Sequence, residues 1–160
     1  MKISKNYKNL ILIIATISLA GVTFGMTMPL STLTLRSWGV SSTMIGLNSA
    51  MPALSAVLLT PFLPKFINQW GQANVIKFCL VLVATCCICL PLFPDLFSWF
   101  ILRFLLGAGA TGIWVLSEVW INGYAEDHNR GKIIGAYTAV LSLGFIIGVL
   151  MFSVIGIEDN

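Results

Sequence analysis

Five long apolar segments, separated by short polar connections, dominate the sequence. They cover residues 10–30, 44–63, 75–93, 97–121 and 133–156. Each holds about 19 to 25 residues, and a helix of that length spans a ~30 Å hydrocarbon core at ~1.5 Å per residue. A segment that crosses lipid must satisfy its own backbone hydrogen bonds, so all five are predicted to be helices. The expected fold class is all-α transmembrane.

The composition supports the bilayer as solvent. Apolar residues make up 58% of the 160 residues, charged residues make up 9%, and the mean hydropathy is +0.93. Soluble domains carry about 25% charged residues. The connections are short, so residues 1–160 are expected to build one helical bundle without a separate soluble domain.

The cationic residues predict an orientation. Seven of them fall on the side of the amino terminus: Lys2, Lys5, Lys8, Lys65, Lys77, Arg130 and Lys132. Only Arg36 falls in an opposite connection. Because cytoplasmic loops are rich in Lys and Arg, we predict a cytoplasmic amino terminus and an outside end at Asn160. The net charge of +3 therefore reflects topology, and no nucleic-acid partner is expected.

No motif for enzymatic chemistry is found. The sequence lacks a Walker loop, HExxH and GxSxG. Four cysteines gather in the third segment: Cys79, Cys86, Cys87 and Cys89. They are interpreted as small apolar packing residues, because a metal site would need a second ligand pair. His128 is expected to be a solvated loop residue. We predict no enzyme, no metal and no cofactor.

Small residues four positions apart predict close helix packing. The pairs are Gly21 with Gly25, Gly131 with Gly135, Gly144 with Gly148, Gly107 with Thr111, and Ala108 with Gly112.

Arg103 is a cation that lies well inside an apolar segment, the fourth. It sits about 9 Å into the fourth segment at ~1.5 Å per residue. Burying it costs ~2.5–3.5 kcal/mol on insertion scales, so it is expected to face the bundle interior or a water-filled cavity. The alternative is that it snorkels outward to the interface.

Glu118 follows on the same helix, about 22 Å farther and about 60° away in azimuth. With Gly107, Ala110 and Trp114 it would complete a stripe suited to a polar pathway. The alternative places Glu118 at the interface, paired with Arg130 or Lys132.

Arg103-x-x-Leu106-Gly107-x-Gly109-Ala110 resembles the fourth-helix motif R-x-x-Q-G-x-G-A of the major facilitator superfamily, with Leu106 in place of glutamine. In that family the arginine faces the central cavity.

Two further segments resemble the same family. "NRGKIIGAY" (129–137) is similar to the element that opens the fifth helix, and "GFIIG" (144–148) to its G-P-x-x-G motif, with Phe145 in place of proline. "SEVWIN" (117–122) is similar to a signature of a bacterial subgroup typified by YcaD.

The loop between the second and third segments departs from the family. The family's loop motif is G-x-x-x-D-R-x-G-R-K. Here only Gly71 keeps its place, while Pro64, Asn68 and Gln69 stand where the motif has its first glycine, its aspartate and its first arginine. Neutral Asn68 and Gln69 predict a weakened charge-based latch.

The resemblance implies a fold of twelve helices in two halves, of which this chain would supply a truncated amino-terminal portion with five. It implies an expected pathway lined by Arg103, Glu118, Trp114, Thr23, Thr27 and Asn48. The expected conformational motifs are Gly71, Asn68, Gly107, Gly109, Arg130, Gly131, Gly144 and Gly148.

The function expected from the resemblance is secondary transport of a small molecule across the bacterial cytoplasmic membrane by alternating access, with proton coupling left open. The missing half or a second copy would be a partner. The alternatives are a non-transporting remnant and a small membrane protein acting as a homodimer.

Overall fold

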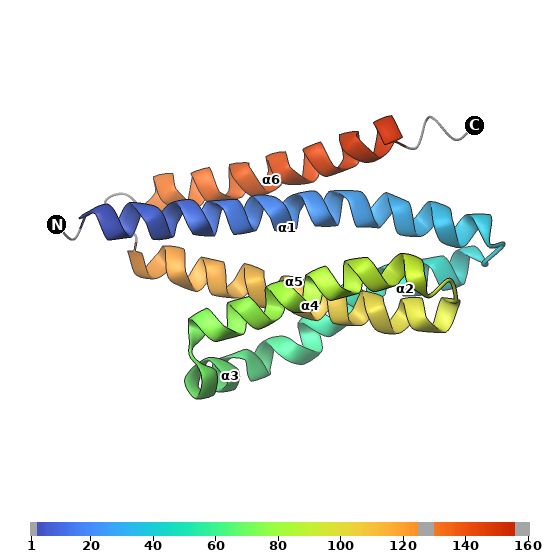
Figure 1. Cartoon of the computed structure of the whole chain (residues 1–160), viewed down its shortest axis with the longest axis horizontal. Helices are drawn as coiled ribbons and strands as arrows, with labels where there is room; N and C mark the ends of the chain where they lie inside the picture. Colours follow the sequence, from blue (N-terminus) through green and yellow to red (C-terminus); the bar gives the residue numbers. More distant parts are fainter. Residues whose placement is uncertain (1–2, 125–129, 156–160) are drawn as a thin grey trace. The chain divides into compact units, whose positions relative to one another are not determined.

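The computed structural model describes residues 3–124 and 130–155, which contain only helices and their short connections (Figure 1). The elements are α1 (Ile3–Ser37), α2 (Ser42–Leu59), η1 (Thr60–Phe62), α3 (Leu63–Trp70), α4 (Gln72–Leu92), α5 (Leu96–Tyr124) and α6 (Arg130–Ile155). His128, Asn129 and the last five residues lie outside the described residues.

The prediction of an all-helical chain with five membrane-spanning helices is confirmed for the described residues. The segments long and apolar enough to cross a membrane are Ala15–Ser37, Ser42–Trp70, Gln72–Leu92, Leu96–Trp120 and Gly131–Met151. The chain forms two compact units, one of Met1–Leu30 with Ser117–Asn160 and one of Ser31–Leu116. Each unit is described by itself.

In the first unit, α1 packs on α6 through four glycines. A Cβ added to Gly21 would lie 2.6 Å from the Leu141 carbonyl oxygen, and one added to Gly25 would overlap the backbone of α6 at Phe145. Gly144 and Gly148 meet the backbone of α1 in the same way. The residue numbers rise together along both helices, so α1 and α6 run parallel (Figure 1). Small residues here allow backbone contact, which in lipid is a main source of helix association.

The other glycine pair of α6, Gly131 and Gly135, has open space around it among the described residues, so its packing role stays a prediction. Spacing alone did not reveal which face of α6 meets α1. The buried apolar residues of this unit are Ile17 and Tyr137, with Trp120, Ile133 and Leu141 packed against them.

In the second unit, α1 ends in a tight turn that leads into α2. Gly39 has φ +73°, a conformation that glycine adopts at little cost. The Val40 N–H donates to the Leu35 carbonyl at 3.1 Å and the Gly39 N–H to the Arg36 carbonyl at 3.0 Å, the pattern of a Schellman cap. Ser41 then caps α2 through its side chain.

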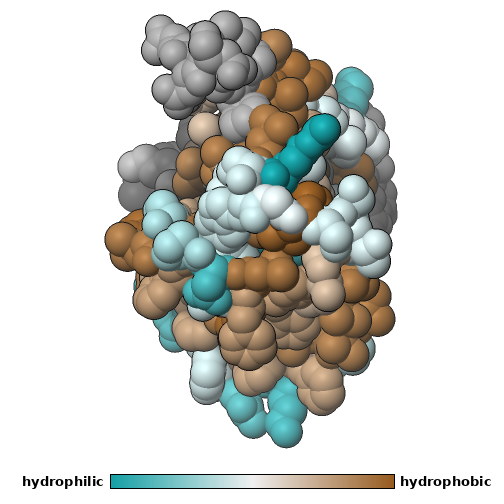
Figure 2. Space-filling view, turned by 90° about the vertical axis from the view of Figure 1, so that its right-hand side faces the viewer, coloured by the Kyte–Doolittle hydropathy of each residue, from teal (hydrophilic) through white to brown (hydrophobic). Residues whose placement is uncertain are grey.

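The core of the second unit lies among the end of α1, α4 and α5. Its buried residues are Leu35, Cys86, Leu90, Trp99 and Leu106. The Trp99 Nε1 donates to the Leu90 carbonyl at 3.1 Å, which satisfies the polar edge of the ring. Cys86 is part of this apolar core, in keeping with its predicted packing role. Figure 2 views the end that holds the α1–α2 and α4–α5 connections, where apolar side chains cover much of the surface with hydrophilic ones between them.

The connection between the second and third spans differs from expectation. It was expected as a loop, whereas the structure forms η1 and the helix α3 there. Gly71, with φ +77°, then turns the chain into α4.

Candidate functional site

The site is built on a contact between α2 and α5 in the second unit. Gly107 lies directly against the backbone of Pro52, and a Cβ at Gly107 would lie 2.5 Å from the Ser55 Oγ. That hydroxyl donates to the Pro52 carbonyl at 2.8 Å, so its own hydrogen-bonding demand is met locally. Farther along α5, Gly112 lies near Leu63, the first residue of α3, and Figure 1 shows α2 and α5 running in the same direction. The two helices are therefore parallel neighbours.

Arg103 lies one turn before Gly107 on α5. Its relative exposure is 0%, and its Nε, Nη1 and Nη2 atoms have no hydrogen-bond partner among the described residues. The side chain therefore does not snorkel to the surface in this structure. A guanidinium offers five N–H donors, and leaving them unpaired in a dry interior is costly.

Asn48 lies one turn before Pro52 on α2 and is also 0% exposed. Neither its Oδ1 nor its Nδ2 finds a partner within the part of the chain that the structure describes. Pro52 has no N–H to donate to the Asn48 carbonyl, so the backbone there lacks its usual helical bond. Because α2 and α5 run parallel, Asn48 and Arg103 lie on the same side of the Pro52–Gly107 contact, each one turn away.

The second unit contains no acidic residue suited to neutralise Arg103. Asp95 is the only acid among residues 31–116, and it lies about two turns before Arg103 at the start of α5. Its Oδ1 accepts a hydrogen bond from the Ser98 N–H at 2.8 Å. Hydrogen bonds from the Ser98 backbone and side chain hold the pKa of this exposed carboxyl below its ordinary value. Asp95 is thus engaged as a helix cap.

The predicted stripe on α5 divides by burial. Arg103, Gly107 and Ala110 are buried, whereas Trp114 and Glu118 are exposed. Glu118 belongs to the first unit, where it interacts electrostatically with the Tyr137 hydroxyl. The Arg130 side chain lies outside the described residues, so the structure leaves its predicted pairing with Glu118 as an expectation.

The hydroxyl groups of Thr23 and Thr27, the two pathway residues predicted on α1, donate hydrogen bonds to carbonyl groups of the same helix. The Thr23 hydroxyl donates to the Leu19 carbonyl at 2.8 Å, and the Thr27 hydroxyl to the Thr23 carbonyl at 2.8 Å. Thr27 is buried and Thr23 is half-buried.

The conformational motif residues fall into packed and open groups. Gly109 packs on α4, where an added Cβ would lie 2.8 Å from Val83 and 3.0 Å from the Cys79 carbonyl oxygen. Asn68 and Gly71 are exposed at the end of α3, and Gly131 is exposed on α6.

Sequence reasoning did not identify Pro52, Ser55 or Tyr137. Tyr137 is buried in the first unit, and its hydroxyl has no hydrogen-bond partner among the described residues. A proline and a serine three residues apart in an apolar helix were the only signal for the partner of Gly107.

A family model described as Major Facilitator Superfamily matches residues 11–158. Three bacterial relatives are described as uncharacterized MFS-type transporters. YfkF of Bacillus subtilis is 22% identical over 154 residues (93% of this chain, 38% of the relative), and YcaD of Salmonella paratyphi B is 27% identical over 142 residues (89% and 36%). Ent638_1421 of Enterobacter is 29% identical over 109 residues (68% and 28%). The chain spans about a third of the length of these relatives.

Proposed function

The chain belongs to the Major Facilitator Superfamily, and from this premise we propose that it serves secondary active transport of a small solute by alternating access. It is a multi-pass membrane protein, and its family serves transmembrane transport in general and is generally not enzymatic. We place it in the bacterial cytoplasmic membrane, with the amino terminus in the cytoplasm and Asn160 outside. Further pathway helices would come from a second half or a second copy.

One observation carries the proposal: Arg103 and Asn48 are buried at one level of the second unit without partners among the described residues. Intramembrane ionisable groups are costly and concentrate on solute and ion pathways. In this proposal, Arg103 donates hydrogen bonds to an anionic group of the solute or shifts the protonation of a carboxylate. Asn48 adds a neutral donor and acceptor beside it.

The exposed residues of α5 take complementary roles. Glu118 carries a proton or cation, or acts as a latch residue. Trp114 lines the pathway from α5, and Thr23 and Thr27 line it from α1. Gly107 and Gly109 keep α5 close to α2 and α4, and Gly144 and Gly148 keep α6 close to α1, so that each unit can move as a body.

The experiment measures the melting temperature of the purified chain in detergent with small carboxylates and phosphates, each compared with an uncharged amide or ester analogue. The expected result is that at least one anion raises the melting temperature, and that Arg103→Gln removes the shift. Lys132→Gln, which changes an exposed cation on α6, should retain it. An anion shift that persists in Arg103→Gln, or the absence of any anion-specific shift, would overturn the role of Arg103.

A further inference from the structure

A surface at the end of α2, in the second unit, carries an inference beyond transport. Phe62, at the end of η1, and Phe66 and Trp70, in α3, are four residues apart. At about 100° per residue, they lie on one side of this helical segment. All three are exposed, and Trp70 is 52% exposed. Leu63 beside them is buried. The aromatic residues therefore lie next to the side that packs on the protein.

Phe66 and Trp70 form a connected cluster with Phe78 at the start of α4. The ring centroids of Phe66 and Trp70 are 5.7 Å apart, and those of Trp70 and Phe78 are 6.2 Å apart. Gly71 reverses the chain between them, and the Asn74 Nδ2 donates to the Trp70 carbonyl at 3.0 Å. Phe66, Trp70 and Phe78, together with the exposed Phe62, are called the aromatic patch below.

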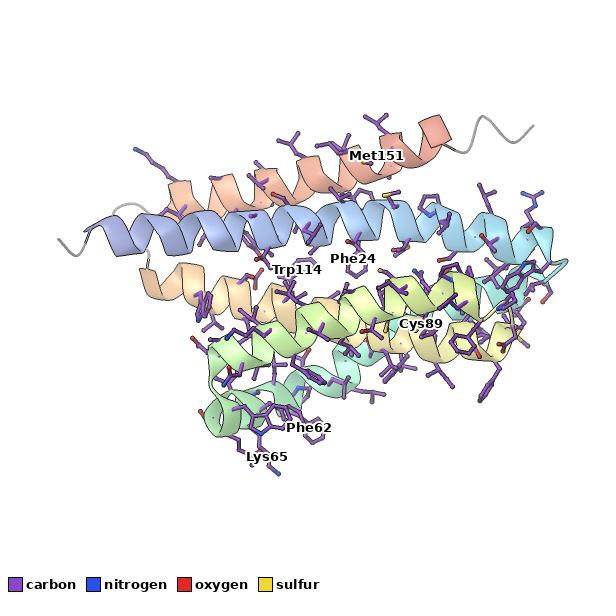
Figure 3. All side chains as sticks on the ribbon, viewed as in Figure 1. Phe24, Phe62, Lys65, Cys89, Trp114 and Met151 are labelled. Carbon is purple, nitrogen blue, oxygen red and sulfur yellow. The ribbon has the colours of Figure 1, made fainter. Side chains whose placement is uncertain are left out.

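Two cations border the aromatic patch. Lys65 precedes Phe66 and Lys77 precedes Phe78, and both lysines are exposed. Figure 3 shows Phe62 and Lys65 projecting from this part of the chain on the side away from α4. No acidic residue precedes Asp95 in the sequence, so the patch has a positive border without a nearby carboxylate from its own helices.

The combined length of α2 and η1, continued to Leu63, puts the patch near the membrane surface. Residues 42–63 are about 33 Å long at ~1.5 Å per residue, which is enough to cross a ~30 Å hydrocarbon core. α3 thus begins where the bilayer interior ends. Aromatic rings with lysines beside them are typical of the membrane–water interface, where rings enter the headgroup level and ammonium groups meet phosphates.

We propose that the aromatic patch with Lys65 and Lys77 is a binding surface for anionic phospholipid, in which the rings enter the acyl boundary and the two ammonium groups bind headgroup phosphates. The surface would hold the end of α2 and the start of α4 at a fixed depth in the membrane. Two neutral residues of α3, Asn68 and Gln69, cannot form ion pairs that would compete for the lysines.

The test uses the full chain in nanodiscs of phosphatidylcholine with a minority of phosphatidylglycerol, in which only the phosphatidylglycerol carries brominated acyl chains. Contact quenching of Trp70 is obtained as the difference between the chain and its Trp70→Phe variant. The expected result is quenching above that set by the mole fraction of phosphatidylglycerol. Each lysine near the surface contributes about 1 kcal/mol of attraction to anionic lipid. For two lysines this corresponds to a local enrichment of phosphatidylglycerol of up to roughly 30-fold.

Matched variants make the result decisive. Lys65→Gln with Lys77→Gln should reduce the quenching to the mole-fraction value. Arg36→Gln with Lys132→Gln, which removes two exposed cations elsewhere, should leave the enrichment unchanged. Mole-fraction quenching in the unchanged chain, unchanged enrichment in the first double variant, or no lipid contact of Trp70 would each overturn the proposal.

Discussion

Gly107 of α5 lies directly against the backbone of Pro52 of α2, and this contact sets Arg103 and Asn48 one turn away on the same side. Two parallel helices can approach so closely only where one of them lacks a side chain. The position of the buried polar pair therefore depends on a glycine that takes no part in binding.

Replacing Gly107 should separate α2 from α5. In Gly107→Val, the added methyl groups meet the Pro52 backbone, which cannot move as a side-chain end could. We expect the free energy of unfolding, measured by titration with a denaturing detergent, to fall by about 1–3 kcal/mol. Gly46→Ala is the matched control, because Gly46 lies on α2 with open space among the described residues and alanine is the better helix former. Equal stability of the two variants would contradict the contact.

Replacing a glycine at the α1–α6 contact of the first unit should also destabilise the chain. Gly25→Val places its side chain against the α6 backbone at Phe145, so we expect a lower melting temperature of the purified chain. Gly135→Ala on α6 has open space around it and should keep the melting temperature or raise it. If Gly25→Val were as stable as Gly135→Ala, parallel packing of α1 on α6 through glycines would be wrong.

Arg103→Met should stabilise the chain in the absence of solute. The variant replaces a buried cation, which has no partner among the described residues, with an apolar side chain. A charged group at membrane depth costs ~2.5–3.5 kcal/mol on insertion scales. We expect the free energy of unfolding to rise by about 2 kcal/mol while the anion-dependent shift disappears. Arg36→Met, at an exposed position, should change the stability little. A less stable Arg103→Met would indicate a partner that already holds the guanidinium.

The cap at the start of α5 predicts a pH dependence. The pKa of Asp95 is below its ordinary value of 3.8 because Ser98 donates hydrogen bonds to the carboxylate. A depressed folded-state pKa contributes stability that is present above pH 3.8 and is lost as the pH falls through the lower folded value. Asp95→Asn should keep a cap while removing this part of the pH dependence. Melting temperatures from pH 7 down to the acid range, compared between the chain and the variant, check the prediction; identical acid profiles would contradict it.

The helices were predictable from the sequence because lipid permits few alternatives. A long apolar segment must satisfy its backbone internally, so the segments around residues 75–93 and 97–121 had to be helical. The contacts between helices were predictable only in part. Gly131 and Gly135 have the same spacing as Gly144 and Gly148, yet only the second pair meets α1, because the rotation of α6 decides which face is covered.

The candidate site was predictable in part. The depth of Arg103 follows from counting residues along its segment. Which residue of α2 lies beside α5 depends on how the two helices are shifted along their axes, and no local sequence pattern indicates that shift, so Pro52 could not be predicted. Asn48 could be named as a polar residue within a span, but its burial beside α5 could not. The helix α3 was missed because residues 64–70, which begin with a proline and precede Gly71, were expected as part of a loop. Phe62, Phe66 and Trp70 nevertheless already had helical spacing.

We propose that the chain crosses the membrane five times, with the lysine-rich ends of its helices in the cytoplasm. Reporter fusions check this topology, with alkaline phosphatase and green fluorescent protein fused in turn after Gln69 and after Asn160. We expect fluorescence without phosphatase activity after Gln69, and phosphatase activity without fluorescence after Asn160. Fluorescence after Asn160, or phosphatase activity after Gln69, would contradict it.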